Sequence, residues 1–331
     1  MDTRRVFTTI DTHTAGGPTR IITSGLPVLP GATVRERLEW FKGHLDPIRK
    51  LLLNEPRGHR DMYGAVLTPA TDPAADLGVF FATAGGYLPT CVHSSIGVAV
   101  ALLETGALSV TGSRRELCFE TPSGLVALEP RREAGHPTAI ALKTQPAFVQ
   151  QADASLDAPS RRLAVDLVFA GVFFVLIDAT RNGLDLGKER LPELIVLGQH
   201  VLAEANRGFT PSHPEQPNAG PFALALFYQR TGDRAVRDVV IGRTGAVDRS
   251  PCGAGSGALA VLLRARGELG IGDEITIEGV IGTRFVARVL EDTTVGGLAA
   301  GRPEISGTAC ITGFHQFVLD VNDPLQEGFL L

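Results

Sequence analysis

The sequence is poor in cysteine and lysine, and it contains no long apolar run. Its four cysteines are too few and too scattered for a disulfide framework or a zinc motif, so we expect free thiols in a cytoplasmic protein. Lysine occurs at only four positions, which leaves few candidates for a Schiff-base residue. No stretch reaches the roughly 18 apolar residues of a membrane span, and no apolar signal region follows the first residues. We therefore expect no membrane partner.

The charge balance argues against a nucleic-acid partner. Lysine and arginine total 31 against 36 acidic residues, a formal net charge of −5, and the basic residues are not concentrated in one stretch. With 44% hydrophobic and 20% charged residues, the chain has the composition of a globular protein. A length of 331 residues exceeds what one hydrophobic core usually serves, so we expect two domains.

Two segments of the chain resemble each other and predict an internal duplication. Residues 91–108 and 252–269 align without gaps, with Cys91 opposite Cys252 and Gly106 opposite Gly267. Both segments predict an apolar helix that ends at its glycine. A strand precedes each helix and a hairpin follows it. The repeated unit is therefore expected to be strand, strand, helix, strand, cysteine helix and hairpin.

This repeat predicts an α/β (α+β) protein of two similar lobes. The lobes are expected at 1–145 and 160–303, with a linker at 145–159 and with 304–331 returning to the first lobe. The elements expected before the cysteine helices are strands at 6–10, 20–23 and 77–83 with a helix at 34–53, and strands at 163–169, 172–177 and 238–241 with a helix at 187–205.

The paired cysteines suggest acid and base chemistry in a crevice between the lobes. A thiol at a helix N-terminus lies beside unpaired N–H groups, which lower its pKa and also bind a carboxylate. Two such thiols on opposite faces of a carbon can invert it, because one removes a proton and the other returns one. A single cysteine at a glycine-rich turn is more often a packing residue. We expect that packing role for Cys118 and Cys310.

The segment around the second cysteine resembles a protein family. Asp248-Arg-Ser-Pro-Cys252-Gly-Ala-Gly-Ser is similar to the pattern Asp-Arg-Ser-Pro-Cys-Gly-Thr-Gly-Thr of the proline racemase family, which includes 4-hydroxyproline 2-epimerases and trans-3-hydroxyproline dehydratases. Supporting motifs lie at 11–16, 54–59, 305–309 and 311–315, so the resemblance covers nearly the whole chain. It implies a diaminopimelate-epimerase-like fold, in which each lobe is a mixed sheet wrapped around a central helix and the active site lies between the lobes.

The resemblance also implies a role for each site residue. Cys91 and Cys252 would be the two acid/base residues, and His93 and Asp248 would hold the ring nitrogen of the substrate. The backbone at Ser94, Ser95, Gly253 and Ala254 would bind its carboxylate. We expect no metal, no cofactor and a homodimer.

One departure from the family pattern concerns the first cysteine. The family has Met-Cys-Gly-His-Gly there, and this chain has Thr-Cys-Val-His-Ser at 90–94. The side chains of Val92 and Ser94 are expected to narrow or reshape the carboxylate cradle, which bears on the identity of the substrate.

Other functions fit the sequence less well. The glycines at 253–257 resemble a dinucleotide-binding loop, but no strand leads directly into them. Ser256 does not lie in Gly-x-Ser-x-Gly, and no histidine pair has the spacing of a helical zinc site. The family's dehydratases carry threonine in place of the second cysteine, so Cys252 argues against dehydration.

We therefore predict a cofactor-independent epimerase of proline-like imino acids, preferably 4-hydroxyproline. The alternatives are a proline racemase, a trans-3-hydroxyproline dehydratase and a non-catalytic imino-acid binding protein.

Overall fold

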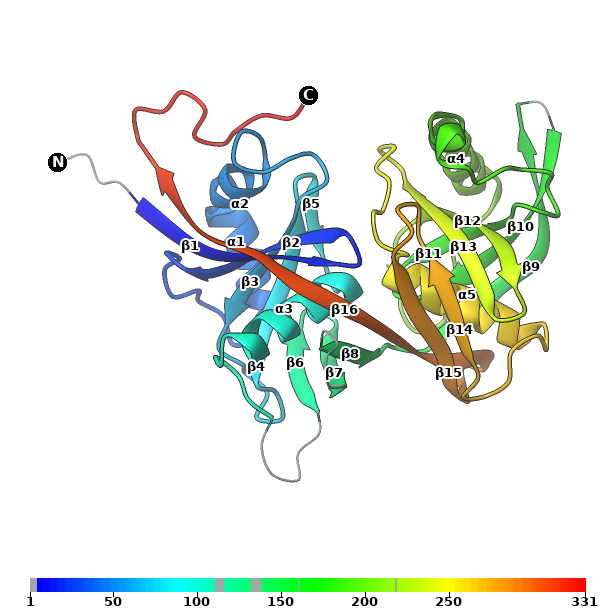
Figure 1. Cartoon of the computed structure of the whole chain (residues 1–331), viewed down its shortest axis with the longest axis horizontal. Coiled ribbons are helices and arrows are strands. Elements are labelled where there is room, and N and C mark those ends of the chain that lie inside the picture. Colours follow the sequence, from blue (N-terminus) through cyan, green and yellow to red (C-terminus); the bar gives the residue numbers. More distant parts are fainter. Residues whose placement is uncertain (1–4, 111–115, 132–137, 160, 218) are drawn as a thin grey trace. The chain divides into compact units, whose positions relative to one another are not determined.

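The chain forms two compact units of mixed α and β structure in which strands predominate. The structure is a computed structural model that describes residues 5–110, 116–131, 138–159, 161–217 and 219–331. The first unit comprises Met1–Leu142 and Gly307–Leu331, and the second comprises Lys143–Ser306. The chain therefore leaves the first unit, builds the second and returns to the first (Figure 1). Over the described residues, none of the helices combines the length and apolarity needed to cross a bilayer.

The first unit is built on a mixed sheet in the order β1-β2-β3-β4-β6-β7-β8, with β5 paired to β4. The β2–β3 and β4–β6 pairs are parallel and the other neighbours are antiparallel. The final part of β16 adds to β1, from Ala309 opposite Thr14 to Leu319 opposite Arg5. The strands are β1 (Arg5–Thr14), β2 (Gly17–Ser24), β3 (Tyr63–Thr68), β4 (Leu77–Thr83), β5 (Gly86–Leu88), β6 (Leu117–Thr121), β7 (Gly124–Arg131), β8 (Ala139–Lys143) and β16 (Leu298–Leu319).

Helices cover both faces of this sheet. Helix α3 (Val92–Glu104) packs against β1, β2 and β3, and its residues from Val92 to Leu103 are all buried. A helix that is apolar on every side belongs inside a protein, which explains the central position of α3 (Figure 1). Helices α1 (Val34–His44) and α2 (Asp46–Leu53) contribute to an apolar cluster that includes Phe41, Leu52 and Phe80.

The single helix predicted over 34–53 is wrong, because the chain forms α1 and α2 in its place. The two helices are separated at Leu45, whose backbone leaves the helical conformation. Pro47 lies at the start of α2. Proline has no N–H group to continue the hydrogen bonds of α1, but it is well suited to the first turn of a new helix.

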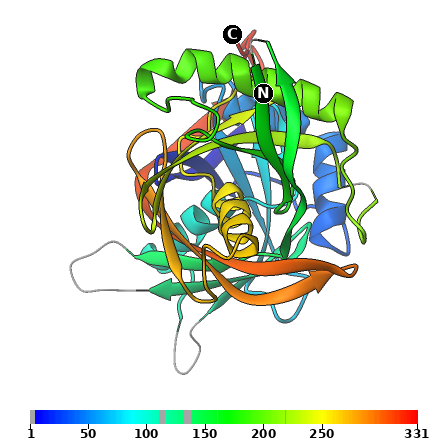
Figure 2. The same cartoon turned by 90° about the vertical axis from the view of Figure 1, so that its right-hand side faces the viewer.

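The second unit is a closed sheet around a central helix. Its strands follow the order β9-β10-β11-β12-β13-β14-β15-β16, and β16 also pairs with β9. Figure 2 shows α5 enclosed by these strands and α4 outside them. The elements are β9 (Ala147–Ala158), β10 (Arg161–Phe169), β11 (Phe173–Asp178), the 3-10 helix η1 (Lys188–Arg190), α4 (Leu191–Gly208), β12 (Phe222–Gly232), β13 (Ala235–Gly242), α5 (Gly253–Ala265), β14 (Glu274–Glu278) and β15 (Arg284–Val295).

The linker predicted at 145–159 is wrong, because most of this segment is strand β9. Phe148 and Leu156 are buried in the second unit, and β9 pairs with β10 along much of its length. The polar residues that suggested a linker include Gln151 and Asp157, which are exposed. A strand that has one solvated face and few apolar residues therefore resembles a loop in composition.

The same order of strand pairings occurs in both units. The β11–β12 and β13–β14 pairs are parallel, as β2–β3 and β4–β6 are in the first unit. Helices α3 and α5 each lead into the second strand of such a parallel pair. Gly106 and Gly267, which follow these helices, both have φ +73°, a conformation that favours glycine. The predicted order lacked β3 and β5 in the first unit and β9 and β12 in the second, so each unit has two more strands before its cysteine helix than expected.

Candidate active site

One candidate cluster of the first unit lies at the N-terminus of α3. Cys91 occupies the N-cap position. Its Sγ lies 3.6 Å from Nδ1 and 3.9 Å from Nε2 of His93, and 3.2 Å from Oγ of Ser94. All three side chains are buried, and Ser94 has no exposed surface. The structure thus brings together the predicted cysteine, histidine and serine of the first unit.

Three strands fix the position of His93. The aromatic ring of Tyr63, at the start of β3, contacts the imidazole edge to face. Gly17, at the start of β2, lies on the ring as well: a Cβ added there would be 3.1 Å from Cδ2 of His93. Thr14 Oγ1 donates a 2.7 Å hydrogen bond to the carbonyl oxygen of His93. The imidazole is therefore oriented by residues that the sequence analysis did not select.

The surroundings of Cys91 favour its thiolate. Burial by itself raises the pKa of this thiol, but the positive charge of His93 and the hydrogen bonds with Ser94 outweigh it, so the pKa lies below its ordinary value. The lowered pKa predicted for Cys91 is confirmed. Its physical causes are mainly a neighbouring charge and hydrogen bonds, and such a thiol is suited to act as a base.

The Ser95 backbone amide, expected to bind a carboxylate, already has a hydrogen-bond partner within α3. The Ser95 N–H donates to the carbonyl oxygen of Cys91 at 3.0 Å, the first hydrogen bond of α3, and the Ser95 hydroxyl donates to the same oxygen at 2.7 Å. An α-helix leaves only the N–H groups before this first bond without a partner inside the helix. Any anion site at this end must therefore use amides ahead of Ser95, such as that of Ser94.

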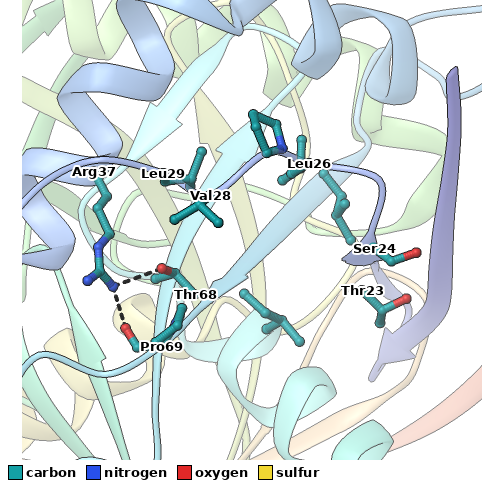
Figure 3. A pocket seen from close by; sticks show the side chains of 11 residues that line it. Thr23, Ser24, Leu26, Val28, Leu29, Arg37, Thr68 and Pro69 are labelled. Carbon is teal, nitrogen blue, oxygen red and sulfur yellow. Dashed lines mark hydrogen bonds between the residues drawn. The ribbon is translucent and has the colours of Figure 1, made fainter.

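A cavity of about 200 Å³ in the first unit lies away from this cluster (Figure 3). It is lined by the last residues of β2 and β3, whereas their first residues, Gly17 and Tyr63, contact His93. Arg37 donates from its guanidinium to Thr68 Oγ1 and to the carbonyl oxygen of Pro69 at the rim. Because β2 and β3 are parallel, the cavity and the cysteine cluster lie at opposite ends of these strands.

A candidate cluster of the second unit lies at the N-terminus of α5. Cys252 is the N-cap residue, with φ 47° and ψ 100°. A positive φ is uncommon for a residue with a side chain and stores backbone strain, which concentrates at functional sites. The Ser256 N–H donates to the carbonyl oxygen of Cys252 at 2.7 Å, so the amides of Gly253 and Ala254 precede the first helical bond. These two predicted residues are placed where a helix can bind an anion.

Asp248 is held beside Cys252 by its own loop. The N–H of Asp248 donates to the carbonyl oxygen of Val240 in β13. Asp248 Oδ1 accepts hydrogen bonds from the amide and the hydroxyl of Ser250, at 3.0 and 2.9 Å. The Asp248 carboxylate is close enough to the Cys252 thiol to raise its pKa. A predicted substrate-binding acid and a predicted catalytic thiol are thus neighbours.

The lowered pKa predicted for Cys252 is wrong. Burial raises the pKa of this thiol well above its ordinary value, and the negative charge of Asp248 raises it further. The hydrogen bond from the Gly255 amide favours the thiolate but does not outweigh these effects. Cys252 is therefore suited to hold a proton, whereas Cys91 is suited to accept one.

Asp238 is a buried acid near Cys252 that the sequence analysis did not select as a site residue. It lies in β13 with 1% of its surface exposed, and its Oδ2 has no hydrogen-bond partner within the described structure. Burial and the charge of Asp248 raise the pKa of Asp238 well above its ordinary value. An aspartate beside Val239 and Val240 in a predicted strand was the signal that could have revealed it.

The other two cysteines lie in strands of the first unit. Cys118 is half-buried in β6. Cys310 in β16 is exposed, so the packing role expected for it is wrong. A residue in a strand with one solvated face can point to solvent, which a strand-like sequence alone does not determine.

Comparison with known proteins assigns the chain to a family. The family model described as proline racemase matches residues 9–330. The chain belongs to the proline racemase family. It is 39% identical to a 4-hydroxyproline 2-epimerase of Streptosporangium roseum, with all of both chains covered, and 36% identical to a proline racemase of Acetoanaerobium sticklandii, with 97% of each covered. The crystal structure of a hydroxyproline epimerase from Agrobacterium vitis with bound trans-4-hydroxy-L-proline superposes with a TM-score of 0.89 at 32% identity, covering 100% of this chain and 97% of that one.

Membership of the proline racemase family identifies the chain as an enzyme of the isomerase class. The resemblance inferred from the motifs is thereby confirmed. The similarity of the folds also confirms the mixed α and β class, dominated by strands.

Proposed function

We propose that this enzyme inverts Cα of a proline-like imino acid, preferably 4-hydroxyproline, without a cofactor. In this proposal, the half-sites at α3 and α5 engage the same substrate molecule, with Cys91 on one face of Cα and Cys252 on the other. The observation that carries the proposal is the opposite electrostatics of the two thiols. His93 favours the thiolate of Cys91, and Asp248 favours the protonated thiol of Cys252.

Inversion by two bases requires one thiolate and one protonated thiol at the start of each turnover. The Cys91 thiolate removes the α-proton, and its electron pair remains on Cα as a carbanion stabilised by the adjacent carboxylate. The Cys252 thiol then gives its proton to the opposite face. The reaction leaves a thiol at Cys91 and a thiolate at Cys252, which is the form that processes the other enantiomer.

The polar groups of an imino acid match the remaining site residues. Its ring ammonium can donate to the Asp248 carboxylate, whereas His93 in the charged form that favours the Cys91 thiolate has no lone pair to accept from that ammonium. Its carboxylate can accept from the Ser94, Gly253 and Ala254 amides at the two helix N-termini. Ser95 takes no part in this cradle, because its amide is bonded to Cys91.

Proton exchange with solvent tests this proposal. Incubation in deuterium oxide with L-proline, trans-4-hydroxy-L-proline and their α-epimers should replace the α-proton, measured by NMR, and chiral analysis should show the inverted product. Preferential turnover of proline would make the enzyme a proline racemase. Formation of a cyclic imine from trans-3-hydroxy-L-proline would support a dehydratase. Binding without exchange at high enzyme concentration would overturn the epimerase proposal in favour of an imino-acid binder.

We further propose that the units arose by internal duplication, and that the enzyme is a cytoplasmic homodimer. The recurring order of parallel and antiparallel strand pairs supports the duplication. Cell fractionation tests the location. Sedimentation of the purified enzyme tests the dimer, and a monomer at working concentration would contradict it.

A further inference from the structure

Three buried side chains form a continuous line of hydrogen bonds at the start of α3. Thr19 Oγ1, from β2, donates to Ser94 Oγ at 3.0 Å. Ser94 Oγ lies 3.2 Å from Cys91 Sγ. Thr19 and Ser94 each have none of their surface exposed. A strand residue is thus connected to the candidate base through a single hydroxyl group.

The number of protons on these three side chains determines which of them donates in each hydrogen bond. A serine hydroxyl has one proton to donate and two lone pairs that accept. While Cys91 is a thiol, its proton can point to Ser94. Once Cys91 is a thiolate, it has no proton, and the bond persists only if Ser94 donates to sulfur. Thr19 favours that arrangement because its donated proton occupies a lone pair of Ser94 and leaves the Ser94 proton for the thiolate.

We infer that Thr19 and Ser94 form a hydroxyl relay that maintains a hydrogen bond on the Cys91 thiolate. The inference rests on the proposed role of Cys91 as a base and makes Ser94 and Thr19 positioning residues for it. Ser94 stands where the family pattern has glycine, so this hydroxyl belongs to the chain's own version of the motif. A buried anion requires such donors, because burial without them strongly disfavours the charge.

The titratable groups on the strands around α3 are compatible with a hydroxyl donor to the Cys91 thiolate. Strands β1, β2 and β3 pack against the helix. Their titratable residues are Arg5, Asp11, His13, Arg20 and Tyr63. Asp11 and Arg20 form an ion pair with each other at 2.8 Å, and His13 Nδ1 accepts the Gly16 amide at 3.3 Å. His93, which Tyr63 contacts, supplies the charge that favours the thiolate, and the relay supplies a neutral donor.

The relay is testable without any substrate. In the full-length chain with Cys118, Cys252 and Cys310 replaced by alanine, thiolate ultraviolet absorbance measured against pH reports Cys91 alone. Loss of a hydrogen bond to a charged group should reduce the thiolate fraction below the titration midpoint by about tenfold in Ser94→Ala. Thr19→Val, which removes only the orienting donor, should reduce it roughly threefold. Alkylation of Cys91 by iodoacetamide should slow in the same order.

Two matched variants separate the hydroxyl from packing. Thr19→Ser keeps the donor and should titrate like the parent. Thr12→Val alters a buried threonine directly opposite Thr19 in the β1–β2 pair, whose hydroxyl bonds a carbonyl oxygen, and should also leave the midpoint unchanged. The relay is overturned if folded Ser94→Ala and Thr19→Val titrate like the parent, or if Thr12→Val shifts the midpoint as far as Thr19→Val. If the relay variants shift the titration midpoint of Cys91 but the enzyme exchanges no α-protons, the proposed function is refuted and the relay is retained.

Discussion

The ring of Tyr63 meets the imidazole of His93 edge to face, with ring centroids 4.4 Å apart and planes at 78°. Tyr63 begins β3, whereas His93 lies in the first turn of α3. The contact therefore connects the sheet to the histidine whose charge favours the Cys91 thiolate. Gly17 packs against the same imidazole, so the ring has little freedom to turn away from Cys91 Sγ.

We expect Tyr63→Leu to reduce α-proton exchange and inversion by about 3- to 10-fold. An aromatic pair of this geometry contributes about 0.5–1.5 kcal/mol, and its loss allows the imidazole to leave Cys91. Tyr63→Phe keeps the ring and should remain close to wild type. The measurement is kcat and KM for epimerisation, with the Cys91 thiolate titration as a second readout. Equal activity in Tyr63→Leu and Tyr63→Phe would show that the contact does not orient His93.

Replacing either of the cysteines proposed as acid and base should produce enzymes with opposite stereochemical preferences. Cys91→Ala and Cys252→Ala should each lose inversion by at least roughly 10²-fold, as expected for a positioned acid or base. Each should still exchange the α-proton of the one enantiomer that presents it to the remaining thiol. Deuterium incorporation into each enantiomer, followed by NMR, checks this. A Cys252→Ala enzyme that inverts substrate at the wild-type rate would contradict the two-base mechanism.

Strongly periodic or repeated segments were predictable from the sequence. The aligned segments that begin at Cys91 and Cys252 gave both central helices and their terminal glycines, because apolar composition and a glycine stop are local signals. Strand β9 was missed because its apolar residues are sparse, and the break between α1 and α2 was missed at Pro47. These errors arise where a single residue or one solvated face decides the structure.

Only the site residues that lie in sequence motifs were predictable. Cys91 and Asp248 lie in recognisable sequence patterns, but some of the groups around them come from strands elsewhere in the sequence. Thr19 reaches Ser94 from 75 residues away in the sequence, and Asp238 lies in β13 without a motif of its own. The pKa of Cys252 is raised by its burial and by Asp248, and the negative charge of Asp238 adds to their effect. A helix N-terminus considered alone gives the opposite sign for that thiol.

The two active-site thiols should differ in reactivity at neutral pH. The lowered pKa of Cys91 means that its thiolate persists to lower pH, whereas the raised pKa of Cys252 keeps that group a thiol. Iodoacetamide should therefore modify Cys91 at least about tenfold faster than Cys252, as measured by mass spectrometry of the labelled peptides. Pyrrole-2-carboxylate, which is planar like the carbanion, should protect Cys91 but not the exposed Cys310.

Asp248→Asn provides the matched test of this difference. Removing the negative charge beside Cys252 should lower the pKa of that thiol and speed its alkylation, with Cys91 unchanged. Faster alkylation of Cys252 than of Cys91 in the wild-type enzyme would contradict the assignment of acid and base.

Asp238→Asn should stabilise the second unit at alkaline pH. Burial and Asp248 raise the pKa of Asp238 in the folded state above its value in the unfolded chain. The folded state thus retains a proton that the unfolded chain releases, so the wild-type enzyme loses stability as the pH rises from the unfolded pKa toward the folded one. Asparagine has a similar shape and no proton to lose. We expect its Tm to exceed that of wild type above this pH range and the difference to shrink as the pH falls toward 4.

Asp292→Asn is the control for a change of charge in the same unit. Asp292 is exposed and paired with Arg264 at 2.7 Å, and the hydrogen bond from that guanidinium lowers the pKa of its carboxyl. Its replacement should therefore reduce Tm slightly at neutral pH, the opposite sign from Asp238→Asn. Scanning calorimetry of the full-length enzyme at several pH values distinguishes the two. An Asp238→Asn enzyme whose Tm falls at alkaline pH would mean that the Asp238 carboxylate is ionised and needed, and the buried neutral acid would be excluded.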